Sequence, residues 1–141
     1  MKFSSKFISA TRKYNTYFEH VSAPLLRKTF EIEKDIDSAQ ITICGLGFYK
    51  LYINGKYVCE GPSRSEEFTR YYDTIEVPFE KGENEIIFAI AHITEPISFA
   101  TGFKSQKPVL VFDAAGEGES FCSDISWRCR YVENFRFSGD D

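Results

Sequence analysis

The dipeptide Asn54-Gly55 lies between two segments of alternating apolar and polar residues, and it limits the fold more than any other feature of the sequence. Both central residues of a type I′ turn need a positive φ, which asparagine tolerates and glycine adopts readily. We therefore expect residues 48–53 and 56–60 to be antiparallel strands joined by a two-residue turn. A chain built around such a hairpin is expected to contain an antiparallel sheet.

Similar strand-length segments recur along the chain, separated by turn residues at intervals of roughly 8 to 12 residues. In residues 25–33 the alternation has one exception, Lys28, which falls on the apolar face. Residues 85–93 are almost continuously apolar, which predicts a central strand covered on both faces. A buried helix is the alternative there, and the flanking glycine and Pro96 favour the strand. The remaining expected strands are residues 39–44, 71–77, 108–113, 120–123 and 127–132.

About eight strands without a convincing three-turn helix indicate an all-β fold, an antiparallel β-sandwich or jelly roll. The aromatic content of 16% supports a folded, strand-rich chain, and 141 residues suffice for one domain. We expect an N-terminal extension at residues 1–22, the sandwich at 23–135 and a C-terminal tail at 136–141.

Charge and hydropathy exclude several classes of partner. A net charge of −4 gives no basic face for nucleic acid. No apolar run approaches the roughly 20 residues that cross a membrane, so no membrane partner is expected. The N-terminus has no signal-peptide core, which predicts a cytoplasmic protein unless Met1 begins a fragment of a longer one.

The potential metal ligands and catalytic groups are scattered. The four cysteines have no CxxC spacing, and His20 and His92 have no ligand spacing, so we expect reduced, buried thiols and neither a metal nor a cofactor. Nucleophile-elbow, phosphate-loop and calcium-loop motifs are absent. Glu66-Glu67 are adjacent on an extended chain, where neighbours point to opposite faces and rarely act together as acid and base. We therefore expect no catalytic residues.

Four segments, taken in order, resemble the N-terminal accessory domain of bacterial α-L-rhamnosidases. They are APLLRKTF (23–30), AQITICGLGFYKLYINGKYV (39–58), YD (72–73) with KGENEI (81–86), and KPVL (107–110) with SDISWR (123–128). The Asn-Gly hairpin and the Gly-Glu-Asn turn also occur in sugar-binding domains of β-galactosidase-like hydrolases. After the long central strand the family usually carries a Gly-x-Gly-Trp stretch, whereas this chain has AHITEP at 91–96.

The resemblance implies a galactose-binding-domain-like jelly roll that serves as an accessory module of a glycoside hydrolase. Rhamnosidases of this kind place their catalytic carboxylates in a separate, downstream helical barrel, so the chain is expected not to be an enzyme on its own. The implied partners are a rhamnoside-type glycan, a downstream catalytic domain or a second copy of the chain.

Three functions remain open from the sequence, of which a stand-alone cytoplasmic lectin has no specific feature to support it. A sugar-contacting module needs an aromatic platform beside amide or carboxylate groups, and Tyr49, Tyr52, Asn54 and Trp127 are residues of that type. Tyr49 and Tyr52 have opposite parity, so at least one should face the core, and the turn already explains Asn54. A purely structural or dimerisation module is the alternative, which would present a flat apolar patch instead of a concave aromatic groove.

Overall fold

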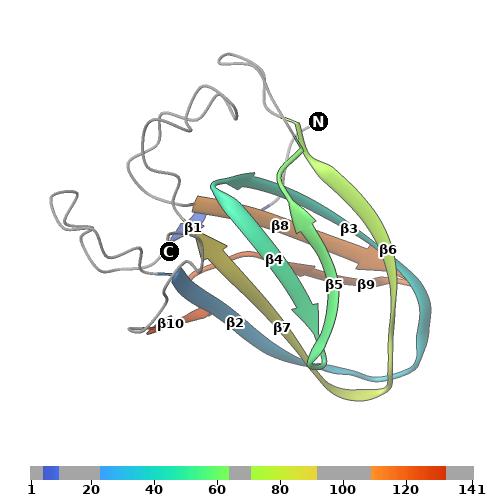
Figure 1. Cartoon of the computed structure of the whole chain (residues 1–141). Coiled ribbons are helices and arrows are strands. Elements are labelled where there is room, and N and C mark those ends of the chain that lie inside the picture. The colour runs from blue at the N-terminus through green and yellow to red at the C-terminus, as the bar shows by residue number, and fades with distance from the viewer. Residues whose placement is uncertain (1–4, 10–22, 64–70, 92–108, 133–141) are drawn as a thin grey trace, which may run out of the picture.

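A computed structural model describes residues 5–9, 23–63, 71–91 and 109–132, and the regular structure in these residues is all β. Two five-stranded antiparallel sheets lie against one another as two layers (Figure 1). The strands are β1 (Ile8–Ser9), β2 (Ala23–Ile32), β3 (Ile36–Leu46), β4 (Phe48–Ile53), β5 (Lys56–Gly61), β6 (Asp73–Phe79), β7 (Gly82–Ala91), β8 (Val109–Gly116), β9 (Glu119–Cys122) and β10 (Arg128–Val132). The expected antiparallel β-sandwich is confirmed.

The two sheets differ in their order of strands. The first sheet has the order β1-β8-β3-β6, and β9 also pairs with β8. The second sheet has the order β10-β2-β7-β4-β5. One edge of β8 pairs with β3. The opposite edge of β8 pairs with two short strands, β1 near its start and β9 near its end.

The tight turns match the glycine and asparagine signals in the sequence. Asn54 has φ 50° and Gly55 has φ 75°, and Ile53 pairs with Lys56 across the turn. Two positive φ values in a two-residue loop are the conformation expected for this hairpin, so that prediction is confirmed. The β8–β9 hairpin repeats the arrangement, with Glu117 at φ 47° and Gly118 at φ 89°.

The long apolar segment forms β7, the central strand of the second sheet, as predicted. Ile86, Phe88 and Ile90 point into the core and are almost completely buried. Ile87 and Ala89 are only half-buried. The expectation of full cover on both faces was therefore too strong, because the described residues place no third layer over the outer face of this sheet.

The core lies between the sheets and is built from the alternate residues of the long strands. Phe88 of the second sheet packs edge-to-face on Phe112 of the first, with ring centroids 5.7 Å apart. The most completely buried side chains are Leu26, Ile32, Ile36, Ile41, Ile43, Tyr49, Leu51, Phe79, Ile86, Phe88, Ile90 and Phe112. All four cysteines are free thiols, of which Cys44 is buried.

Part of the segment expected to be an N-terminal extension joins the first sheet. Ile8 and Ser9 pair with Leu110 and Val109 of β8. The preceding backbone is attached as well, since the Lys6 amide donates to the carbonyl of Ser123 at 3.1 Å. His20, His92, Glu66-Glu67 and the segment expected as a C-terminal tail, 136–141, lie outside the described residues.

Candidate functional site

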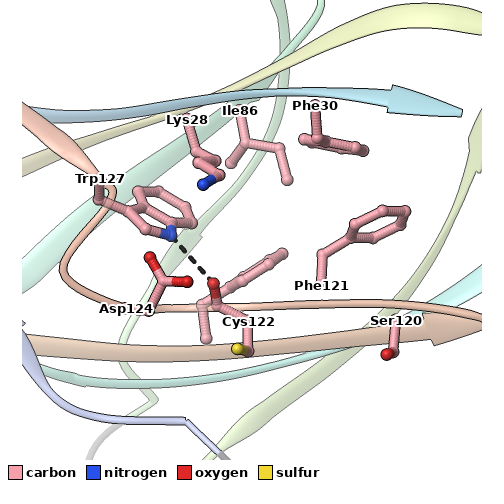
Figure 2. Close-up of a pocket in the computed structure, with 9 residues that line it drawn as sticks. Lys28, Phe30, Ile86, Ser120, Phe121, Cys122, Asp124 and Trp127 are labelled. Atoms are coloured by element: carbon pink, nitrogen blue, oxygen red, sulfur yellow. Dashed lines mark hydrogen bonds between the residues drawn. The ribbon is translucent and has the colours of Figure 1, made fainter.

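A cavity of about 210 Å³ lies between the two sheets, where β9 faces β2. Figure 2 shows side chains from both sheets pointing into it. We call this space the Trp127 cavity. It is lined by Lys28 and Phe30 of β2, Ile86 of β7, Phe112 of β8, Ser120, Phe121 and Cys122 of β9, and Asp124 and Trp127 of the following connection.

Trp127 forms the wall of the cavity at one end. Its Nε1–H donates to the carbonyl of Cys122 at 3.0 Å (Figure 2). The indole packs on the core, with ring centroids 5.9 Å from Phe88 and 5.6 Å from Phe112. Because the indole is only half-buried, it both anchors the core and presents surface to the cavity.

Phe30 and Phe121 form a second aromatic wall. Their ring centroids are 4.2 Å apart and their planes are inclined by 36°. Both rings also pack on the buried Phe79, at 5.5 Å and 6.1 Å. The ring contacts hold both side chains in place while leaving them partly exposed, so the wall exists before any ligand arrives.

Lys28, Asp124 and Ser126 form a polar edge beside the aromatic walls. The Ser126 amide donates to Asp124 Oδ1 at 2.7 Å, and the Ser126 hydroxyl donates to the same oxygen. An aspartate that accepts a hydrogen bond from the amide two residues later forms an Asx turn, which explains the local backbone just before Trp127. Lys28 Nζ donates to Ser126 Oγ and so connects β2 to this turn.

The charges at this edge are fixed by the same contacts. The hydrogen bonds from Ser126 hold the pKa of Asp124 below its ordinary value, and Lys28 acts in the same direction. Asp124 is therefore a carboxylate at neutral pH. Burial raises the pKa of the Cys122 thiol, as do the nearby Asp124 and Asp113, so this cysteine stays protonated and is a poor nucleophile.

Of the four residues predicted for sugar contact, one lines the cavity and three lie elsewhere. Trp127 lines the cavity. Tyr49 is 2% exposed, packs edge-to-face on Phe88 and donates its hydroxyl to Asp73, which leaves no face of its ring for a ligand. Tyr49 is thus the member of the tyrosine pair that faces the core, because its parity on β4 matches that of the buried Leu51.

Tyr52 and Asn54 also lie away from the cavity. Tyr52 is half-buried on the outer face of the second sheet, 5.9 Å from the ring of Tyr57. The side-chain amide of Asn54 donates to Asn84 at 2.8 Å, and its Oδ1 accepts the Glu85 amide at 2.8 Å. Asn54 therefore joins its turn to the start of β7, a structural role.

Lys28, Phe30, Phe121 and Asp124 were not singled out by the sequence as site residues. One signal was present, because Lys28 broke the alternation of its strand by falling on the inward face. The others come from separate segments that only the packing of β9 against β2 brings together. Phe30 and Phe121 looked like ordinary core residues, and Asp124 looked like a turn residue.

The lining of the cavity combines apolar ring faces with polar groups. Ring faces beside a carboxylate, an ammonium group and hydroxyls complement a sugar, which has apolar C–H faces and polar hydroxyls. Of the residues that line the cavity, Asp124 is the one carboxylate, whereas glycoside hydrolysis ordinarily uses two. Among the described residues no group of three or more metal-ligating side chains occurs, nor any helix able to span a membrane.

Comparison with known proteins relates the chain to α-L-rhamnosidases by sequence. No family model matches it. An α-L-rhamnosidase of Formosa agariphila is 33% identical over 72 residues, which is 46% of this chain and 8% of that protein. The α-L-rhamnosidase of Dictyoglumus thermophilum superposes over 78% of this chain and 13% of its own, with 28% identity and a TM-score of 0.64. The chain is thus a homologue of a small part of these enzymes.

Two further solved structures share the fold. A GH78 family rhamnosidase of Bacillus sp. GL1 matches 94% of this chain and 14% of its own, with 17% identity and a TM-score of 0.76. A Pleurotus ostreatus lectin, solved in complex with GalNAc, matches 95% of this chain and 36% of its own, with 18% identity and a TM-score of 0.64. At these identities the likeness concerns the β-sandwich alone.

Proposed function

We propose that this chain is a non-catalytic accessory module of an α-L-rhamnosidase-like glycoside hydrolase, and that its Trp127 cavity binds one sugar residue of a rhamnoside-type glycan. The observation that carries the proposal is the cavity itself, in which aromatic walls meet the carboxylate of Asp124 and the side chain of Lys28. The sequence relation to rhamnosidases and the sandwich shared with a GalNAc-binding lectin support it.

The size of the cavity limits what enters it. Pockets for drug-sized ligands measure about 300–1,000 Å³, so a space of about 210 Å³ suits a single ring. A longer glycan would leave its other residues outside. We expect millimolar affinity, about −4 kcal/mol, which is sufficient when a catalytic domain in the same protein holds the substrate nearby.

Trp127 is the only tryptophan of the chain, so its fluorescence reports directly on the cavity. We expect L-rhamnose or a short rhamnoside to change the emission saturably. Asp124→Asn should weaken the affinity about tenfold, because a hydrogen bond to a charged group is lost. Asp37→Asn is the matched control, since Asp37 is an exposed aspartate of β3 that does not line the cavity, and it should bind like the parent chain.

The bracing alternative has its own surface, on the outer face of the second sheet. Tyr57, 55% exposed, lies there beside the half-buried Tyr52 and Ile87, and Phe48, 44% exposed, lies at the other end of β4. This surface is a sheet face, to which a protein domain would pack, and it is separate from the Trp127 cavity. An emission unchanged up to tens of millimolar sugar would contradict the sugar-binding proposal and favour bracing.

A further inference from the structure

A second pocket, of about 200 Å³, adjoins the Trp127 cavity and has a different chemistry. It is lined by Arg27, Lys28 and Thr29 of β2, by Ser126, and by Arg128 at the start of β10. We call it the Arg128 pocket. Its lining holds three cationic side chains and two hydroxyls and includes no carboxylate.

The pocket lies at the edge of the second sheet, where the pairing of β10 with β2 ends. β10 pairs with β2 from Val132 opposite Ala23 as far as Arg128 opposite Arg27, and the pairing ends there. β2 continues to Ile32, and on this edge its remaining residues have no strand beside them in the described part of the chain. The chain before Arg128 turns away through Trp127 and Ser126, which leaves the space beside Lys28 and Thr29 open.

Arg27 and Arg128 are direct cross-strand partners, and like charges in this arrangement destabilise a sheet. Arg27 is compensated by an ion pair with Glu85. Lys28 is hydrogen-bonded to Ser126 and lies near Asp124. Arg128 lines the pocket, and in the described part of the chain its side chain has neither an ion pair nor a hydrogen bond, so no described anion compensates its positive charge.

An oxyanion would satisfy this arrangement. A guanidinium group donates two parallel hydrogen bonds to a carboxylate or sulfate, and such charge-assisted bonds are stronger than neutral ones. The hydroxyl of Thr29 adds a further donor at the pocket wall, whereas the Ser126 hydroxyl already donates to Asp124. Lys28 lines both the Arg128 pocket and the Trp127 cavity, so a group bound in one lies next to a group bound in the other.

We propose that the Arg128 pocket binds an oxyanion, and that this oxyanion is a sulfate or carboxylate substituent of a sugar whose ring occupies the Trp127 cavity. The first half stands on the pocket alone. The second half rests on the proposed function. Together they make the ligand an acidic saccharide, and they predict that a neutral sugar binds more weakly than its acidic counterpart.

The test is a titration of the full chain, followed by ¹⁵N NMR at low ionic strength, with sodium sulfate, methyl rhamnoside, a sulfate monoester of methyl rhamnoside, and a uronic acid as separate ligands. We expect at least one acidic sugar to bind about tenfold more tightly than methyl rhamnoside. Arg128→Gln should remove that difference. Arg130→Gln should preserve it, because Arg130 lies opposite Leu25 on the same strand and lines neither pocket.

The outcomes separate the two proposals. If methyl rhamnoside shifts the Trp127 signals, but neither acidic sugar gains affinity and sulfate shifts no signals around Arg128, the oxyanion inference is wrong and the sugar-binding proposal stands. If sulfate shifts the signals around Arg128 while no sugar shifts those of Trp127, the pocket binds free oxyanions and the saccharide half is wrong. If the Arg128→Gln variant still prefers an acidic sugar, other residues recognise the negative charge, and the inference is overturned.

Discussion

The Tyr49 hydroxyl links the two sheets at one point, because it donates from β4 of the second sheet to Asp73 of β6 in the first. Asp73 also accepts a hydrogen bond from Ser63 at 2.7 Å. The space around this pair is closed, since a Cβ added to Gly61 would lie 2.5 Å from the tyrosine oxygen. A residue predicted as a sugar platform thus has a structural role.

Tyr49→Phe is expected to lower the free energy of unfolding by about 1–3 kcal/mol, because Asp73 loses a partner inside the fold. Tyr57→Phe is the matched control and should change stability by no more than ~0.5 kcal/mol, since Tyr57 is exposed. Urea denaturation measures both values. Equal stabilities for the two variants would contradict a structural role for the Tyr49 hydroxyl.

The same tyrosine predicts an alkaline effect. Burial raises the pKa of Tyr49 above its ordinary value of about 10, and the hydrogen bond to Asp73 adds to the shift. Above pH ~10 the unfolded chain loses this proton while the folded chain keeps it. The free energy of unfolding therefore falls with pH, by about 1.4 kcal/mol per pH unit from this group. In Tyr49→Phe the free energy of unfolding should fall less steeply above pH ~10, by that amount per pH unit.

Ser126 fixes the charge of Asp124, which gives sugar binding a pH dependence. Because the pKa of Asp124 is held low, its carboxylate persists through mildly acidic pH and is lost only as the pH falls through the lowered pKa. Ser126→Ala removes the hydroxyl donor and should shift the acidic loss of sugar affinity to a higher pH. Fluorescence titrations from pH 7 down to pH ~3 measure the shift, and identical profiles would contradict the assignment.

At the scale of elements, the two positive-φ hairpins define the register of the strands they join. Gly55 has φ 75°, and a Cβ added to it would meet no atom within 4 Å, so any cost of a side chain there comes from the backbone. Asn54 strengthens the same hairpin through its contacts with Asn84 and Glu85. The β4–β5 hairpin is therefore a local unit attached to β7.

Gly55→Ala should destabilise the fold by about 1–2 kcal/mol, because a Cβ disfavours the left-handed conformation. Lys56→Ala, next to it in an ordinary strand conformation, should cost no more than ~0.5 kcal/mol. Urea denaturation again provides the comparison. An unchanged stability in Gly55→Ala would mean that the turn does not need its positive φ.

The strands and turns were largely predictable where neighbouring residues alone determine them. The Asn-Gly hairpin and the apolar run of β7 follow from residue types and period alone. β1 was missed because two residues carry no period, and it exists only through pairing with β8. β3 begins at Ile36, earlier than expected, because an irregularity between Ile36 and Ala39 lets it keep pairing with β6.

At the scale of the whole molecule, two adjoining pockets lie on one side of the sandwich, where β9 faces β2 and β10 begins. The sequence predicted the layers but not this site, because Lys28 is far along the chain from Phe121 and Asp124, and only the packing of β2 against β9 brings them together. Trp127 was predicted as an aromatic residue able to form a sugar platform, and its place in the cavity follows the Asx turn before it.

The central claim, that the Trp127 cavity binds sugar, is tested most directly by ¹⁵N NMR titration of the chain with L-rhamnose and short rhamnosides. The single indole Nε1–H and the amides of Lys28 and Asp124 should shift together and saturate at millimolar sugar. Amides around Tyr52 and Tyr57 should stay in place. No shifts up to tens of millimolar, or shifts confined to the Tyr52 face, would contradict the claim.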